Sequence, residues 1–289
     1  MDTPQNNTHT AQAPSRGFSA LAKKHFTLKN ALNLLLFGLF CYAFTLFVVR
    51  GASNMGYFWQ WYRLSAVFLL GGDGSFFSGS LWRGLETTLR LSLFSLIPAI
   101  LLALLVTEMR LSGGIVEKAL AVGYVQFIRN TPLLVQILFM YFVLAPFFDF
   151  DAQLSAIIAL TLFEGAYMSE IFRGGFLSVG WGQWEAAYSL GLSRFTVVRA
   201  IILPQAVRNV LPPLLSQCVS LVKDSSLASV ISVAELTHNG KVEAASSLLA
   251  LEIWLTVALV YLALSLILSG LAWLLRLYLR RGDRGGGLA

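Results

Sequence analysis

Long apolar segments constrain the fold of this 289-residue chain more than any other feature of its sequence. Residues 31–49 contain no charged side chain, and residues 248–275 contain a single acid, Glu252. About 20 consecutive apolar residues in a helix are long enough to cross the hydrocarbon core of a bilayer. Four further segments are mostly apolar, so we predict six membrane-spanning helices: residues 31–49, 85–109, 116–148, 152–172, 209–234 and 248–275. The third is predicted to be interrupted in its middle by residues 129–132, which end in Pro132, and the fifth by Pro212, Pro213 and the polar residues 223–226.

The composition indicates an all-α, polytopic membrane protein. Of its residues, 56% are hydrophobic and only 12% are charged, whereas a soluble domain carries roughly twice that charged fraction. The formal net charge of +6 could indicate a nucleic-acid partner, but no basic cluster is interleaved with aromatic residues, so we expect none. Cys41 and Cys218 lie far apart and the three histidines are scattered, so neither a disulfide nor a metal site is predicted.

The distribution of Lys and Arg predicts the orientation. Basic residues cluster at 16–29, 110–118, 173–208 and 276–284, which six spans place on one side of the membrane. The positive-inside rule makes that side the cytoplasm and both termini cytoplasmic, although four outer arginines (Arg50, Arg63, Arg83 and Arg90) weaken the asymmetry. We therefore expect a disordered basic tail (1–30), an extra helix (31–50), an outer interfacial loop (51–82), a five-helix core (83–280), an outer loop within it (236–245) and a flexible tail (281–289).

The cytoplasmic segment 183–204 is predicted to form two short helices. Gly191 can adopt the left-handed conformation that ends the first, and Ser193 can cap the second. Helical spacing predicts one apolar face, made of Trp184, Tyr188, Phe195, Val198 and Ile202. Periodicity alone leaves two interpretations equally open: this face rests on the membrane surface, or the segment docks against another protein.

The spacing of four elements in this segment resembles the coupling loop of ABC importer permeases. Glu185-Ala186-Ala187 is followed after three residues by Gly191, and after nine more by Ile201-Ile202-Leu203-Pro204. In that family the loop forms a coupling helix that sits in a cleft of the ATPase. The resemblance implies that the coupling residues here are Glu185, Ala186, Ala187, Gly191, Leu203 and Pro204.

Three further segments resemble the polar amino acid permeases of the histidine/glutamine type. These are FIRNTPLLVQ at 127–136, GAYMSEIFRGG at 165–175 and SLVKDSSL at 220–227. The resemblance runs from about Gly84 to the last span and implies a MetI-like, type I ABC importer permease fold in a bacterial inner membrane, with amino acids as substrates. Asn130 and Ser225 stand where the family more often has Gly and Thr, and the helix at 31–49 is additional to the usual core.

The sequence contains no phosphate-binding G-x-x-x-x-G-K-[ST] motif, so we expect this chain to bind no cofactor and ATP hydrolysis to occur on another polypeptide. The resemblance implies a pair of ATPase subunits that bind ATP and Mg, a second permease chain, identical or different, and an external solute-binding protein. A secondary transporter and an intramembrane enzyme are the competing classes. Neither explains the segment 183–204, and we find neither paired broken repeats nor a catalytic motif.

Ionisable and polar side chains at membrane depth are candidates for the substrate pathway, because burying them in a bilayer is costly. For Arg129, Glu170, Lys223 and Asp224 the favoured interpretation is structural ion pairing, with substrate contact as the alternative. No nearby residue in the sequence pairs with Glu164, which makes it the stronger substrate candidate. The full set of pathway candidates is Arg129, Glu164, Glu170, Ser216, Ser220, Lys223 and Asp224.

Overall fold

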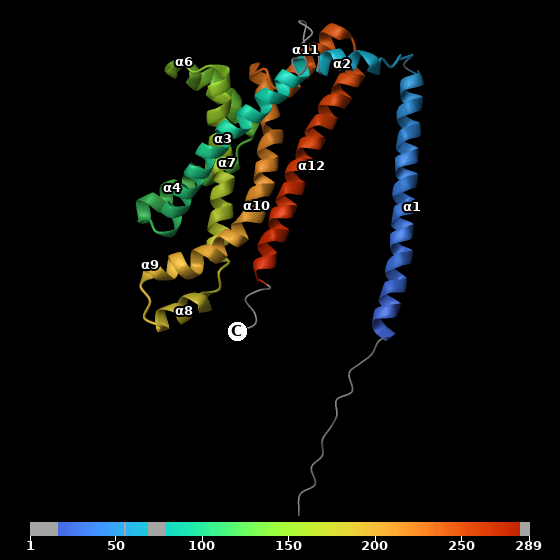
Figure 1. Cartoon of the computed structure of the whole chain (residues 1–289). Coiled ribbons are helices and arrows are strands. Elements are labelled where there is room, and N and C mark those ends of the chain that lie inside the picture. Colours follow the sequence, from blue (N-terminus) through green and yellow to red (C-terminus); the bar gives the residue numbers. More distant parts are fainter. Residues whose placement is uncertain (1–16, 55, 69–78, 284–289) are drawn as a thin grey trace, which may run out of the picture. The chain divides into compact units, whose positions relative to one another are not determined.

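The computed structural model describes residues 17–54, 56–68 and 79–283, and every regular element in these ranges is helical (Figure 1). The chain divides into two compact units, Met1–Trp59 and Gln60–Ala289. Five helices in the described ranges are long and apolar enough to cross a membrane, or six if one sharply bent pair is counted as a span. This agrees with the six spans predicted from the sequence.

The first unit contains the helix α1, Gly17–Asn54. Its apolar part, Asn30–Gly51, covers the predicted first span. The prediction of a disordered tail up to residue 30 is wrong for residues 17–30, which are helical. Ala20, Leu21, Ala22 and Lys23 are strong helix formers, and they extend the spanning helix backwards. Residues 1–16 lie outside the described ranges.

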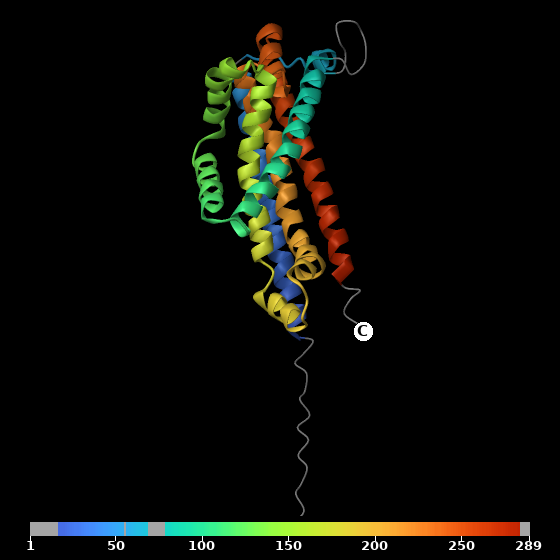
Figure 2. The same cartoon turned by 90° about the vertical axis from the view of Figure 1, so that its left-hand side faces the viewer.

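The second unit is a bundle built around three helices, α3 (Ser80–Leu111), α7 (Ala152–Leu177) and α10 (Leu203–Asp224), with α12 (Ala250–Asp283) packed against α10 (Figures 1 and 2). Small residues bring the central helices close together. A Cβ atom on Gly165 would lie 3.0 Å from the Leu102 side chain, and one on Gly175 would lie 2.1 Å from Cγ2 of Val210. Without a hydrophobic force between helices in lipid, such close contact is what holds spanning helices together.

The predicted interruption of the third span is confirmed. The helix α4 (Ile115–Arg129) ends at Asn130, and α5 (Leu133–Phe139), the π-helical turn η2 (Met140–Leu144) and α6 (Ala145–Phe148) follow at an angle of 103°. Pro132 cannot continue the hydrogen bonding of α4. Nε2 of Gln136 donates to the carbonyl oxygen of Ile128 (2.9 Å), to that of Thr131 (3.1 Å) and to Oγ1 of Thr131 (2.7 Å). The Gln136 amide thus replaces backbone donors that the break removes.

Short helices close the end of the bundle opposite α8: a 3₁₀ turn η1 (Trp61–Arg63), α2 (Leu64–Phe68) and α11 (Leu236–Ser247). The predicted outer loop at 236–245 is therefore wrong, because this segment is helical. Glu235 caps α11 by accepting hydrogen bonds from the N–H groups of Thr237 (2.8 Å) and His238 (2.7 Å), and from the Tyr261 hydroxyl on α12 (2.8 Å). The carboxyl is fully buried, and burial raises the pKa of Glu235.

The remaining domain boundaries shift by a few residues. The core helix α3 begins at Ser80 rather than residue 83, and α12 continues to Asp283, beyond the predicted end at 280. Within the predicted interfacial loop (51–82), the structure has η1 and α2 as far as Phe68, and residues 69–78 and 284–289 lie outside the described ranges.

Candidate functional site

A helical hairpin projects from one end of the bundle and joins α7 to α10 (Figure 1). We call it the α8–α9 hairpin: α8 (Trp181–Ser189), α9 (Arg194–Thr196) and the π-helical turn η3 (Val197–Ile202), which leads into α10. It contains the segment that the sequence predicts to be two short helices. The structure confirms both of them.

The turn of the hairpin has the predicted local chemistry. Gly191 has a φ of +72° and its N–H donates to the carbonyl oxygen of Tyr188 at 2.9 Å. A Cβ atom on Gly191 would meet no atom within 4 Å, so the glycine is needed for its backbone conformation and not for space. Ser193 is the N-cap of α9, and its Oγ accepts from the N–H of Thr196 at 3.3 Å.

The predicted apolar face is partly wrong. The buried residues between the hairpin and the bundle are Val179, Ala187, Val197, Ile202 and Ala206, with Trp184 partly buried beside them. Tyr188 and Phe195, which the prediction placed on this face, are 44% and 71% exposed. A π-helical turn has more residues per turn than an α-helix, so η3 buries Val197 where the 3.6-residue period favours Val198.

The outer surface of the hairpin displays Glu185 beside exposed apolar side chains. Glu185 and Ala186 are exposed, whereas Ala187 packs against the bundle. Nε1 of Trp181 donates to Oε1 of Glu185 at 2.7 Å, which holds the carboxylate in one orientation. Leu190 is 77% exposed at the tip. Leu203 and Pro204, the last two residues of the motif, form the first turn of α10, where proline costs no hydrogen bond.

Glu170 is partly buried and lies in an ion-pair cluster. Oε1 of Glu170 contacts Arg110 of α3 and lies 3.8 Å from Nη1 of Arg129, which ends α4. Its Oε2 accepts from Nη2 of Arg173 at 2.8 Å. The Arg129 guanidinium also lies 5.0 Å from the ring centroid of Tyr167. One carboxylate therefore connects α3, α4 and α7, and no feature of the sequence indicates that Arg110 takes part.

Glu164 is fully buried on α7 and is held by a residue of α10. Its Oε2 accepts from Nε2 of Gln217 at 2.8 Å, and its Oε1 has no hydrogen-bond partner within the described ranges. Gln217 is absent from the predicted set, because an amide side chain in a mostly apolar helix carries no charge signal. Its position one helical turn before the candidate Ser220 is the only sequence feature that could have indicated it.

The remaining candidates lie along α10 near Gln217. Ser216 is exposed and donates to the carbonyl oxygen of Pro212 at 3.2 Å, and Ser220 is partly buried. Lys223 is exposed and Asp224 partly buried, and no ion pair to another described residue fixes either of them. Ser216, Ser220 and Lys223 fall on one helical stripe of α10. The ion-pair cluster of Arg129 and Glu170 lies where α3 and α4 meet α7.

Comparisons with known proteins agree with this architecture. Residues 99–280 match the family model described as binding-protein-dependent transport system inner membrane component. The glutamine transport system permease protein of Escherichia coli K12 is 41% identical over 189 residues, which cover 64% of this chain and 86% of that protein. The L-cystine transport system permease protein of Bacillus subtilis is 42% identical over 189 residues, covering 64% and 80%.

Solved structures show the same fold. An amino acid ABC transporter crystallised with histidines matches with a TM-score of 0.65 and 33% identity, over 68% of this chain and 92% of that one. The MetNI methionine ABC transporter, in an inward-facing conformation, matches with a TM-score of 0.60 over 69% and 96%, at 18% identity. The chain is thus a multi-pass membrane protein with the fold of ABC importer permeases, and it belongs to the family of binding-protein-dependent transport system inner membrane components.

Proposed function

We propose that this chain is the permease subunit of an ABC importer that moves polar or charged amino acids across the cytoplasmic membrane of a bacterium. The observation that carries the proposal is the α8–α9 hairpin, which displays Glu185 on its exposed side and keeps the spacing to Gly191 and Pro204. The relatives support the choice of substrate class, since their names assign them glutamine and cystine.

The orientation follows from the positive-inside rule. The hairpin, the end of α3 and the end of α12 carry Arg194, Arg199, Arg110 and Arg276 at one end of the bundle. We place this end in the cytoplasm, with both termini there, and α2, α6 and α11 on the outer side.

The proposed machine contains more than this chain. A pair of ATPase subunits binds ATP and Mg and hydrolyses the nucleotide, while this chain binds no cofactor and is not itself an enzyme. A second permease chain completes the pathway, and an external solute-binding protein delivers the amino acid. The solute-binding protein is supported by the description of the matched family, whose transport systems are called binding-protein-dependent.

The geometry suggests how docking changes the pathway. The hairpin is continuous with α7 at one end and α10 at the other, and these two helices carry Glu164 and Gln217. When the ATPases close around ATP, the hairpins move with them, and α7 and α10 move together. This rearrangement exposes the pathway alternately to the two sides of the membrane.

The pathway itself is proposed to run past Glu164 and the polar stripe of α10. A zwitterionic substrate requires an anion for its ammonium group and a cation or helix N-terminus for its carboxylate. Oε1 of Glu164 has an unused acceptor position, and Lys223 supplies a cation on the same helix as Gln217. Arg129 and Glu170, which lie in the ion-pair cluster, are proposed to hold the helices in place.

The test uses the complete importer in vesicles with the binding protein enclosed. Changing Glu185→Arg should lower substrate-stimulated ATP hydrolysis by roughly tenfold or more, because a charge reversal at a docking surface removes a pair and adds repulsion. Gln183→Arg adds the same charge to an exposed position of α8 without removing Glu185, and it should retain most of the stimulation. Equal stimulation in wild type and Glu185→Arg would exclude the hairpin as the coupling element.

A further inference from the structure

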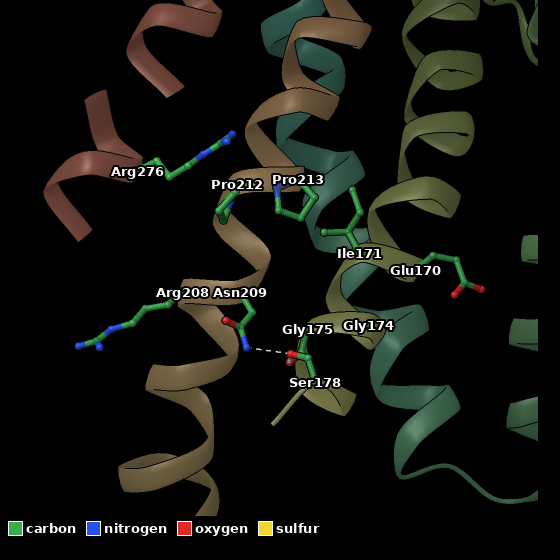
Figure 3. A pocket seen from close by; sticks show the side chains of 10 residues that line it. All are labelled: Glu170, Ile171, Gly174, Gly175, Ser178, Arg208, Asn209, Pro212, Pro213 and Arg276. Atoms are coloured by element: carbon green, nitrogen blue, oxygen red, sulfur yellow. Dashed lines mark hydrogen bonds between the residues drawn. The ribbon is translucent and has the colours of Figure 1, made fainter. Parts of the chain in front are cut away.

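Two cavities lie near the α8–α9 hairpin. One, of about 740 Å³, is bounded by α7, α10 and α12 (Figure 3). Nδ2 of Asn209 donates to Oγ of Ser178 at 2.8 Å beside it. Its charged side chains do not converge, because Arg208 and Arg276 point apart and the Glu170 carboxylate points away from both (Figure 3). These charges therefore share no binding point for one ligand.

The other cavity, of about 600 Å³, lies between the ends of α3 and α7 and the hairpin. Most of its lining is apolar, including Leu104 and Leu111 of α3, Phe176 of α7 and Trp184 of α8. Ligand sites in proteins commonly have this size, with mostly apolar walls and a few polar groups that fix the orientation of the ligand. The cavity therefore has the dimensions and the lining of a binding site.

The cavity lies at the level of the membrane–water boundary. Leu111 and Leu177, which both line it, are the last residues of the candidate spans of α3 and α7. Trp181 and Trp184 line it from α8, and tryptophan is enriched at this level of a bilayer. A ligand in the cavity would thus lie partly among lipid headgroups and partly against hydrocarbon.

An exposed apolar stripe of α3 leads into the cavity. Leu93, Ile97, Leu101 and Leu104 are all exposed, and they follow one another at helical spacing, so they share one side of the helix. Leu104 is also part of the cavity lining. In a bilayer this stripe provides a continuous surface for an acyl chain, from the membrane interior to the cavity.

Glu108 and Arg194 are the charged residues of the cavity lining. Both are exposed, and their side chains form no hydrogen bond or ion pair with each other or with another described residue. The planar fork of an arginine matches a phosphate group, and a carboxylate accepts hydrogen bonds from an ammonium group. Opposite charges that line one cavity without pairing therefore suit a zwitterionic ligand, whereas the acid disfavours an anionic one.

We propose that this cavity binds a zwitterionic phospholipid with a primary ammonium group, which is the chemistry of phosphatidylethanolamine. Its phosphate lies on Arg194, its ammonium group on Glu108, and one acyl chain along Leu104 and the exposed stripe of α3. The lipid fills the space between α3 and the hairpin and contacts Trp181, whose Nε1 donates to Glu185 at 2.7 Å. The site does not depend on the transported substrate; only its assignment to the cytoplasmic leaflet rests on the proposed function.

The experiment measures lipid binding to the full chain, purified in mild detergent with whatever subunits remain bound. Native mass spectrometry should show tighter binding of short-chain phosphatidylethanolamine than of phosphatidylglycerol with the same chains, because the latter has no ammonium group for Glu108. Phosphatidylcholine, whose quaternary ammonium cannot donate a hydrogen bond, should bind with intermediate affinity. Equal binding of phosphatidylethanolamine and phosphatidylglycerol would overturn the proposal.

Two variants should change the binding in different ways. Arg194→Gln should weaken the binding of both phosphatidylethanolamine and phosphatidylglycerol by about fivefold, since one charge near a charged headgroup contributes about that factor. Glu108→Gln should weaken phosphatidylethanolamine by a similar factor without weakening phosphatidylglycerol. A disturbed fold would instead lower the binding of both lipids in both variants. Equal losses of the two lipids in Glu108→Gln would therefore contradict the assignment of the ammonium group.

Arg199→Gln is the matched control, because it removes an exposed arginine from the same hairpin outside this cavity. It should leave the binding of each lipid unchanged, and a loss as large as that in Arg194→Gln would refute the site. Glutamine tests the other kind of zwitterion. Displacement of the lipid by glutamine would make the cavity an amino-acid site and overturn the lipid assignment; we expect none. The coupling test with Glu185→Arg measures ATP hydrolysis, so its outcome is independent of these results.

Discussion

Nε2 of Gln217 lies 2.8 Å from Oε2 of Glu164, and this hydrogen bond joins α10 to α7 in the interior of the bundle. The other oxygen of the carboxyl group is buried without a partner among the described residues. A buried acceptor that is half satisfied is costly, and such groups are common where a ligand completes the bonding. The pair therefore gives the proposed pathway a carboxyl oxygen at a fixed position that is free to bind a ligand.

Changing Glu164→Gln should alter transport. The amide keeps the size of the side chain and can still bond Gln217, but it removes the acid that can ionise to pair with a substrate ammonium group. Uptake of basic and neutral amino acids into vesicles should fall by roughly tenfold or more, since hydrogen bonds to charged groups contribute about 1.5–3 kcal/mol. Gln217→Glu, which places a second acid beside Glu164, is the variant for comparison. An unchanged uptake profile in Glu164→Gln would remove this residue from the pathway.

Changing Glu170→Gln should destabilise the bundle more than losing any single arginine of its cluster. Arg110, Arg129 and Arg173 would then repel one another around a neutral amide. Removing one member of a buried pair commonly costs about 3 kcal/mol, and the apparent melting temperature in detergent should drop by roughly 5 °C or more. Arg129→Ala should cost less than Glu170→Gln, because the Arg129 side chain is 41% exposed and lies 3.8 Å from Glu170. Similar melting temperatures for all variants would show that the cluster does not hold the helices together.

Two glycines of the hairpin provide a matched pair. Gly191 has a φ of +72° and Gly182 lies inside α8, and a Cβ atom would meet no atom within 4 Å at either position. Gly191→Ala should destabilise the hairpin by about 1 kcal/mol through backbone strain alone. Gly182→Ala should stabilise α8 by up to about 1 kcal/mol, because alanine favours the helix. Protection of hairpin amides from hydrogen exchange measures both. Opposite signs are expected, and a loss of protection in both variants would refute the conformational explanation.

Because Glu235 is buried, we predict that the stability of the protein falls as the pH rises through the range in which this residue titrates. Burial raises its pKa in the folded protein, against the opposing effect of the hydrogen bonds it accepts. The folded state therefore binds the proton more tightly than the unfolded state. As a result, the contribution of Glu235 to the free energy of unfolding falls as the pH rises from below its ordinary pKa through its raised pKa. Glu235→Gln should flatten the fall in melting temperature as the pH rises above about 4, the ordinary pKa of a glutamate. An identical slope in wild type and variant would contradict the prediction.

The sequence predicts best what depends on neighbouring residues. The six apolar segments, the break at Pro132, the turn at Gly191 and the Ser193 cap all follow from local composition, and the structure has each of them. The same local reasoning fails at η3, because nothing in the sequence marks a π-helical turn, and its altered period moves Val197 into the core.

Features that depend on distant residues were missed for a different reason. The helix α11 is weakly apolar, and its cap, Glu235, is completed by the Tyr261 hydroxyl, which is 26 positions away. Arg110 and Glu170 are 60 positions apart, and Gln217 is 53 from Glu164. A polar side chain in a spanning helix indicates that it has a partner, but the identity of that partner depends on how the helices pack.

The contact between Gly175 and Val210 has a mechanical consequence. The two backbones approach so closely here that a single methyl group on Gly175 would lie 2.1 Å from Cγ2 of Val210. Such a close contact prevents the two helices from sliding past each other, because displacement along the helix axis would push the Val210 methyl group into the neighbouring backbone. We therefore expect α7 and α10 to move as one rigid unit along this contact. Bending should be confined to the segments on either side of it.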